Sequence, residues 1–175
     1  PDIILITPSS GTVGTIITVA GNGYSASALI RIYFGLEPTI TTVSSTAYGS
    51  FSTTFTVDTQ VYGTTTMTVI ADNVTEQLLA TFTIKSVIVY VSPSAGSVGT
   101  IVTILGTGYG ATEEIRVDFG TTKTITTVRT SERGSFSTTF TIDTQKYGTT
   151  TVKAVGINTG QEFEVTFNIL SQLIT

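Results

Sequence analysis

The chain has 175 residues, of which 40% are apolar and only 11% are charged, and its formal net charge is −4. This length allows one large domain or two small ones, and the apolar fraction argues against a chain that is disordered by composition. Eight Lys and Arg residues provide no basic stripe, which argues against nucleic-acid binding and against adhesion to anionic lipid.

Threonine accounts for 39 residues, while histidine, cysteine and tryptophan are absent. Threonine is β-branched and suits a pleated surface, so the composition predicts an all-β fold. Without cysteine the chain has neither a disulfide framework nor a thiolate metal site. No apolar run approaches the ~20 residues of a membrane-spanning helix, so no membrane insertion is expected in this segment. Because the chain begins at Pro1 without a signal-like segment, we expect a processed mature protein or a piece of a longer one.

The first half of the chain reads as about seven short strands separated by Gly, Pro, Asn and Asp turns. The predicted strands cover residues 3–7, 15–20, 30–34, 39–44, 51–57, 65–71 and 79–84. In FSTTFTV (51–57), the residues predicted to point inward are Phe51, Thr53, Phe55 and Val57. Period-2 alternation with one polar face is typical of an antiparallel sheet, and seven such strands predict a small Greek-key sandwich.

The second half of the chain repeats the first at a spacing of 85 residues, without a gap. GSFSTTFTVDTQVYGTTT (49–66) and GSFSTTFTIDTQKYGTTT (134–151) are identical at sixteen of eighteen positions. Such a tandem repeat is the signature of an array. We expect one sandwich over residues 1–85 and a second over residues 86–170. Residues 171–175 match the start of the repeat and are expected to be the opening strand of a further repeat or a donated strand.

A family resemblance rests on PSSGTVGTIITVAGNGY (8–24) with IRIYFG (30–35), and on PSAGSVGTIVTILGTGY (93–109) with IRVDFG (115–120). These segments resemble the IPT/TIG group of immunoglobulin-like domains, whose hallmark is a Pro-x-x-Gly-x-x-Gly turn, a Gly-x-Gly-aromatic turn and a strand ending in Phe-Gly. The residues that fit are Gly11, Gly14, Gly21, Gly23, Phe34 and Gly35, and then Gly96, Gly99, Gly106, Gly108, Phe119 and Gly120.

The resemblance implies an all-β fold of two tandem immunoglobulin-like Greek-key β-sandwiches, of about seven strands each. The later half of each repeat is similar to Ig-like repeats on bacterial or archaeal cell-surface proteins, which implies an extracellular location. Domains of this kind serve as spacers, adhesive modules and accessory domains of polysaccharide-degrading enzymes.

The junction TFTIKSVIVYVSP (81–93) passes from the last strand of repeat one into the first strand of repeat two. It has neither glycine nor a flexible serine run, which is the opposite of a flexible linker. The junction predicts two units whose relative motion is restricted.

Catalytic groups are sparse in this sequence. Without His and Cys, the usual nucleophile–base pairs are missing. The close carboxylate pair Glu113 and Glu114 has Ala28 and Leu29 as its counterparts in repeat one. We therefore expect neither enzyme activity nor a cofactor.

Calcium is the metal to weigh, because it takes oxygen ligands. Asp58 and Asp143 occupy matching loop positions in VDTQ and IDTQ and are weak calcium candidates. A calcium loop would pack several carboxylates into a short span, which this sequence lacks. We interpret both residues as Asx turns that close the loop after a strand.

Two pairs of tyrosines and one asparagine are further candidates. Tyr62 and Tyr147 either stack on a ligand or plug the end of the sandwich, and the second role is favoured. Tyr24 and Tyr109, which follow the Gly-x-Gly turns, are expected to be packing residues. The sequon NVT (73–75) lies in a predicted turn and makes Asn73 a candidate glycosylation site.

The outward Ser and Thr residues of the duplicated stretch have two explanations. Either the duplication is recent, or a Thr-lined face touches the same thing in each repeat, such as a neighbouring strand, a glycan coat or a surface. A surface poor in charge and rich in threonine favours a protein that lives in an assembly or under glycans.

We therefore expect a non-enzymatic, extracellular structural protein: a stiff building block of a surface filament, stalk or surface layer. Its expected partners are copies of itself or neighbouring repeats, and glycans. Strands exchanged between subunits could complete a sheet edge, and the candidate residues are Ile3, Ile4, Leu5, Ile6, Leu173 and Ile174. The alternative is a carbohydrate- or surface-binding accessory module of an adhesin or a polysaccharide-degrading enzyme.

Overall fold

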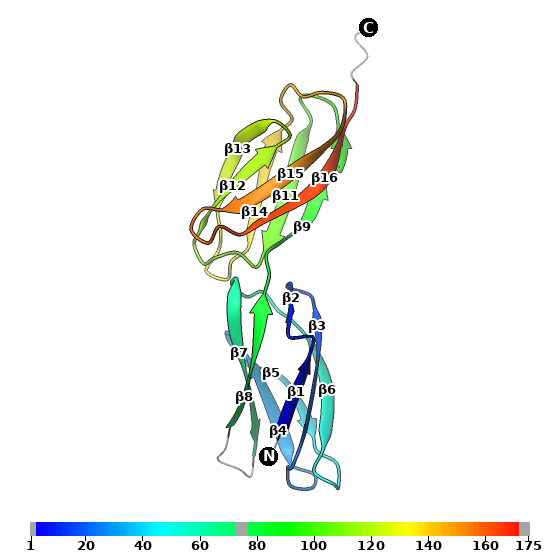
Figure 1. Ribbon diagram of the computed structural model, residues 1–175, viewed down its shortest axis with the longest axis vertical. Helices are drawn as coiled ribbons and strands as arrows, with labels where there is room; N and C mark the ends of the chain where they lie inside the picture. Colours follow the sequence, from blue (N-terminus) through cyan, green and yellow to red (C-terminus); the bar gives the residue numbers. More distant parts are fainter. Residues whose placement is uncertain (1–2, 73–76, 172–175) are drawn as a thin grey trace. The chain divides into compact units, whose positions relative to one another are not determined.

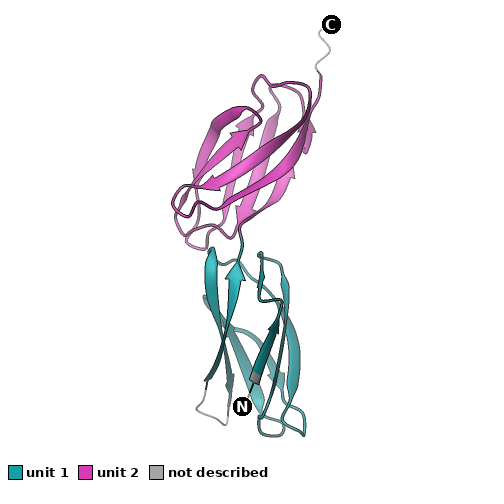
Figure 2. Ribbon diagram, in the orientation of Figure 1, with its two compact units in different colours: residues 1–85 teal, residues 86–175 magenta. Residues whose placement is uncertain are grey.

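The computed structural model describes residues 3–72 and 77–171. The chain divides into two compact units, Pro1–Lys85 and Ser86–Thr175 (Figure 2). Each unit has a hydrophobic core of its own. All regular secondary structure among the described residues is β-strand. The expectation of an all-β fold is confirmed.

Eight strands are described in unit 1 (Figure 1). They are β1 (Ile3–Thr7), β2 (Ser10–Gly11), β3 (Ile16–Asn22), β4 (Leu29–Phe34), β5 (Glu37–Ser44), β6 (Phe51–Thr56), β7 (Gly63–Ala71) and β8 (Gln77–Ile84). They form a three-stranded sheet in the order β1-β3-β6 and a five-stranded sheet in the order β2-β8-β7-β4-β5. Two such sheets around one core form an immunoglobulin-like sandwich.

Unit 2 has the same topology. Its strands are β9 (Val87–Ser92), β10 (Ala95–Gly96), β11 (Ile101–Thr107), β12 (Glu114–Phe119), β13 (Thr122–Arg129), β14 (Phe136–Thr141), β15 (Gly148–Gly156) and β16 (Glu162–Ile169). The three-stranded sheet has the order β14-β11-β9, and the five-stranded sheet has the order β10-β16-β15-β12-β13. Neighbouring strands are antiparallel in both units, except that β2 runs parallel to β8 and β10 runs parallel to β16.

The chain changes sheets at Pro8. Strand β1 ends at Thr7 in one sheet, and β2 begins at Ser10 in the other. Proline has no N–H and cannot donate to a ladder, so the strand is interrupted there. The sequence analysis missed β2 and β10, because a pair of residues carries no alternating pattern. The predicted strands otherwise match the observed ones to within two residues at each end.

The alternation predicted for β6 is confirmed. Phe51, Phe55 and Val57 are buried, Thr53 is half-buried, and the intervening Ser and Thr residues are exposed. Phe34 lies at the centre of the core, with its ring centroid 5.2 Å from that of Phe55 and 5.8 Å from that of Phe82. Burying one such ring contributes about 1.5–3 kcal/mol.

Candidate interaction surfaces

Charge is distributed unequally between the two sheets of each unit. Strands β1, β3, β6, β9, β11 and β14 contain no Asp, Glu, Lys or Arg, so every charged residue that lies within a described strand belongs to a five-stranded sheet. The outward side chains of the three-stranded sheet are therefore all uncharged. We call this surface the neutral face.

The neutral face combines hydroxyl and apolar side chains. In unit 1 it consists of Leu5, Thr7, Ile16, Thr18, Ala20, Ser52, Thr54 and Thr56. In unit 2 it consists of Tyr90, Ser92, Ile101, Thr103, Leu105, Ser137, Thr139 and Thr141. Leu5 is 63% exposed, and Ile16 and Ile101 are each 64% exposed. Leu5 lies opposite Ala20, four residues along β3 from Ile16, so the neutral face of unit 1 carries large apolar side chains towards both of its ends.

Asp58 and Asp143 lie in the loops that follow β6 and β14. The Gln60 side-chain amide donates to Asp58 Oδ1 at 2.8 Å, and the Gln145 amide donates to Asp143 Oδ1 at 2.9 Å. The Thr122 hydroxyl donates to the other oxygen of Asp143. In unit 2 the loop is therefore closed by side-chain donors and not by the backbone N–H of the expected Asx turn.

The surroundings of Asp58 include a second carboxylate, Glu37 at the start of β5. Burial raises the pKa of Asp58, the amide of Gln60 opposes that rise, and the negative charge of Glu37 adds to it. Within residues 3–72 and 77–171, no three Asp, Glu, His or Cys side chains are grouped so that they could hold a metal ion. Calcium takes six to eight oxygen ligands, many more than this pair offers.

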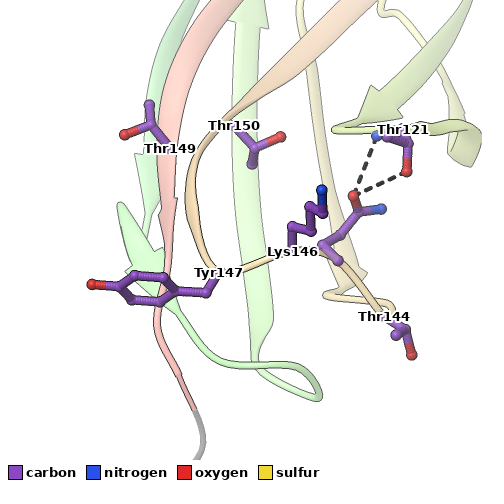
Figure 3. A pocket seen from close by; sticks show the side chains of 7 residues that line it. Thr121, Thr144, Lys146, Tyr147, Thr149 and Thr150 are labelled. Atoms are coloured by element: carbon purple, nitrogen blue, oxygen red, sulfur yellow. Dashed lines mark hydrogen bonds between the residues drawn. The ribbon is translucent and has the colours of Figure 1, made fainter.

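Tyr147 does not plug the end of the sandwich, so the favoured expectation was wrong for this residue. Its side chain is 75% exposed and borders a groove of about 620 Å³. The other lining residues are Thr121, Thr144, Gln145, Lys146, Thr149 and Thr150. Figure 3 shows the Tyr147 ring directed away from Thr121. The Gln145 amide oxygen accepts a hydrogen bond from Thr121 N, and its nitrogen donates to Asp143 Oδ1. The first of these bonds connects the loop that contains Gln145 to Thr121, which also lines the groove. Tyr62, the counterpart in unit 1, is half-buried.

The expectation that Tyr24 and Tyr109 are packing residues is confirmed. Both belong to the cores, and their rings contact Phe51 and Phe136 edge-on, with centroids 5.3 and 5.4 Å apart. Burial raises the pKa of both phenols, and the charge of Glu113 raises that of Tyr109 further. Neither residue is available on the surface for stacking against a ligand.

Glu113 is a structural carboxylate that the sequence analysis did not assign. Its side chain is 1% exposed, whereas Glu114 beside it is exposed, so the two do not form an acid–base pair. Glu113 Oε1 accepts from Asn158 N at 2.8 Å and from Thr159 N at 2.6 Å, and Oε2 accepts from Gly110 N at 2.8 Å. The sequence signal was that Glu113 stands where the first repeat has the small apolar residue Ala28.

The strand-exchange candidates of β1 lie at a sheet edge. Among the described strands, β1 pairs with β3 alone, with Leu5 opposite Ala20 and Ile6 opposite Val19. Ile4 and Ile6 pack partly against the core. Leu173, Ile174 and the sequon at Asn73 lie outside the described residues. None of the described residues belongs to a helix of the length and apolarity that a membrane crossing requires.

Comparison with known proteins gives similarity to solved structures alone. No protein-family model and no curated protein matches the sequence. A C-terminal fragment of intimin, solved with the intimin-binding domain of its translocated receptor, is 12% identical with a TM-score of 0.42. Invasin, a bacterial integrin-binding protein, is 19% identical with a TM-score of 0.42, and domains 4 and 5 of the S-layer protein SbsC are 14% identical with a TM-score of 0.29.

The alignments cover 95%, 97% and 96% of this chain. They cover 62% of the intimin fragment, 39% of invasin and 96% of the SbsC fragment, so the chain spans less than two thirds of the first two. These scores are too low to support an argument about function, and the IPT/TIG resemblance stays a prediction. The immunoglobulin-like fold is established by the strand order described above.

Proposed function

We propose that this chain is a non-enzymatic, extracellular structural protein whose tandem units form a stiff building block of a surface filament, stalk or surface layer. The observation that supports this best is the connection between the units, because only Lys85 and Ser86 separate β8 from β9. Lys85 N donates to Gly11 O at 2.8 Å within unit 1, and the Ser86 hydroxyl donates to Gly108 O at 2.6 Å within unit 2. Each connecting residue is thus fixed to one unit, which supports restricted motion between them.

The surface chemistry supports a place in an assembly at the cell surface. A free monomer normally stays soluble through charged side chains, and this chain has few of them. The neutral faces concentrate hydroxyl and apolar side chains where charges would otherwise keep molecules apart. Copies of the chain are the proposed partners, and a glycan at Asn73 would add to the surface coat.

Strand exchange is the proposed means of joining subunits end to end. Strand β1 is an edge strand of five residues, and an edge with unpaired N–H and C=O groups accepts a strand from another chain readily. In the assembled state, residues 3–6 of one subunit would occupy the β1 position of the next. Leu173 and Ile174 are the second candidate donors.

Electron microscopy tests this function directly. Native material should show rods or fibres with a spacing of one repeat, and a chain that lacks residues 1–7 should form no fibres. Because the deletion also removes Ile4 and Ile6 from the core, a synthetic peptide of residues 1–7 is added in a second experiment. It should restore the fold of unit 1 but no fibres, because a free peptide links no two subunits. Filaments that persist in the deleted chain would exclude strand exchange through β1.

The exposure of Tyr147 favours one second candidate function, a carbohydrate-binding module. An exposed tyrosine beside a groove lined by Lys146 and four threonines could contact a saccharide ring. A glycan array compares the wild-type chain with Tyr147→Ala. Binding that the substitution abolishes would promote this function, and the absence of binding by the wild-type chain would remove it.

A further inference from the structure

The outer faces of the two sheets have diverged differently between the repeats. On the five-stranded sheets, neutral residues of unit 1 have charged counterparts in unit 2: Leu29/Glu114, Tyr33/Asp118, Ser44/Arg129, Thr68/Lys153, Gln77/Glu162 and Leu79/Glu164. On the neutral face no position gains a charge, and five pairs are identical: Ile16/Ile101, Thr18/Thr103, Ser52/Ser137, Thr54/Thr139 and Thr56/Thr141. Recent duplication alone would let charges accumulate on both faces. The difference indicates that something requires the neutral face to stay uncharged.

The neutral faces of the two units also differ in relief. Unit 1 has a hollow of about 350 Å³ in this face, lined by Leu5, Ala20, Gly21, Asn22, Ser50 and Phe51. At the matching positions unit 2 has Tyr90 in place of Leu5 and Leu105 in place of Ala20, and these two residues are paired across β9 and β11. Tyr90 is 50% exposed. Unit 2 thus carries larger side chains at positions that line the hollow in unit 1, and we call Tyr90 and Leu105 the ridge.

We propose that the neutral face is a contact surface between copies of this chain, with the Tyr90–Leu105 ridge of one copy seated in the unit 1 hollow of another. The proposal deepens the proposed structural function, on which it rests, by naming a side-by-side contact that is separate from the exchange of β1.

Charge decides which partner fits this surface. Nucleic acid, anionic lipid and charged polysaccharide all need cationic groups, and the neutral face has none. Two molecules of net charge −4 repel each other, and they approach at least cost through the surfaces that bear no charge. A second copy brings both a neutral face and the ridge that matches the hollow.

Sedimentation velocity over a concentration series compares two double variants with the wild-type chain. Thr54→Lys with Thr139→Lys places one charge on each neutral face, at exposed positions of edge strands β6 and β14. Thr81→Lys with Thr166→Lys is the matched control, with the same change at exposed positions of β8 and β16. We expect the first variant to associate at least tenfold more weakly, because an unpaired charge would be buried, and the control to associate like wild type.

The fit of ridge and hollow is tested by exchanging residues between the units. Ala20→Leu fills the hollow with the side chain that the same backbone position carries in unit 2, and Leu105→Ala lowers the ridge. Each should weaken association by at least tenfold while leaving the melting temperature of its unit within a few degrees. If both variants associate as strongly as the wild-type chain, the ridge does not occupy the hollow and this part of the proposal is wrong.

Two further outcomes overturn the whole contact. One is a wild-type chain that remains monomeric at about 1 mM, where even weak specific contacts are half occupied. The other is equal weakening by both lysine pairs, which would reflect net charge alone. Fibres that still form from Thr54→Lys/Thr139→Lys but stay separate would support both proposals. Fibres of this variant that still lie side by side as the wild-type fibres do would overturn the neutral-face contact alone.

Discussion

Glu113 illustrates how one residue can distinguish two otherwise similar units. A buried carboxylate is costly unless hydrogen bonds compensate it, and Glu113 accepts three backbone N–H groups and the Thr159 hydroxyl. The Glu113 carboxylate thereby connects the loop after β11, through Gly110, to the turn between β15 and β16. Unit 1 has Ala28 at the matching position, whose side chain cannot accept hydrogen bonds.

Replacing Glu113 by Gln should lower the free energy of unfolding of unit 2 by about 1.5–3 kcal/mol, because an NH₂ group would face backbone donors and the charged acceptor would be lost. Urea unfolding followed by hydrogen exchange at Asn158 and Thr159 measures this change. Glu114→Gln, at the exposed neighbouring position, is the control and should stay within about 0.5 kcal/mol of wild type. Equal effects of the two substitutions would contradict the role given to Glu113.

The Asp58–Glu37 pair predicts a pH dependence for unit 1. Because the pKa of Asp58 is raised by burial and by Glu37, folded unit 1 holds a proton to higher pH than the unfolded chain does. The free energy of unfolding therefore falls as pH rises from the ordinary carboxyl pKa through the raised value. In unit 2, Thr122 stands at the position that matches Glu37. Its hydroxyl donates a hydrogen bond to Asp143, whereas the charge of Glu37 repels that of Asp58.

Glu37→Thr, which copies unit 2, should make unit 1 more stable at pH 7 and flatten this fall between pH 3 and pH 7. Calorimetry of the variant and the wild-type chain at both pH values measures the effect. Glu132→Thr, at an exposed loop position of unit 2, leaves Asp58 untouched and serves as the control. A variant whose melting temperature changes with pH as the wild type does would refute the coupling.

At the scale of elements, the strands were predictable and their connections were not. Alternation in FSTTFT marked β6 and β14, since both Phe side chains are buried on one face of the pleated strand and the Ser and Thr residues at the alternate positions are exposed on the other. The two-residue β2 and β10 are fixed by partners far along the chain, Thr83 with Ile84 and Asn168 with Ile169, which no local pattern encodes. Tyr147 was misjudged for the same reason, because its exposure depends on how its loop lies against the rest of the unit.

The glycine that opens the duplicated stretch is required by a close approach between loops. Gly49 has φ of +74°, its carbonyl accepts from Tyr24 N at 3.0 Å, and an added Cβ would collide with the Tyr24 carbonyl oxygen. Gly134 makes the same bond to Tyr109 in unit 2. The first residue of the repeated stretch is therefore glycine in both units, because it packs against the tyrosine that follows the Gly-x-Gly turn.

Gly49→Ala should destabilise unit 1 by more than the about 1–2 kcal/mol that a left-handed alanine costs. The matched substitution is Gly160→Ala, which has a similar φ of +68° but open space around the added methyl group. Thermal unfolding of both variants separates collision from backbone strain. Equal losses in the two units would show that the approach of Gly49 to Tyr24 has no energetic consequence.

At the scale of the whole molecule, the connection between the units offers the sharpest test of stiffness. The wild-type chain has no cysteine, so a cysteine placed at Thr66 and another at Thr166 can each carry a spin label. We expect one narrow distance distribution for the labelled chain and a broad one after Gly-Ser-Gly is inserted between Lys85 and Ser86, because the insert separates two residues now fixed to their own units. Distributions of equal width would contradict a stiff building block.

The short parallel strands have a consequence for tension. In unit 1, Ser9 and Gly11 near the incoming end accept hydrogen bonds from Thr83 and Lys85 near the outgoing end, at 3.0 and 2.8 Å. In unit 2, Ser94 and Gly96 accept from Asn168 and Leu170 in the same way. Pulling on the two ends of a unit slides these strands past each other, so the bonds must rupture together and not one after another. The parallel pairing near the two ends of each unit, where the force is applied, is thus expected to resist mechanical extension.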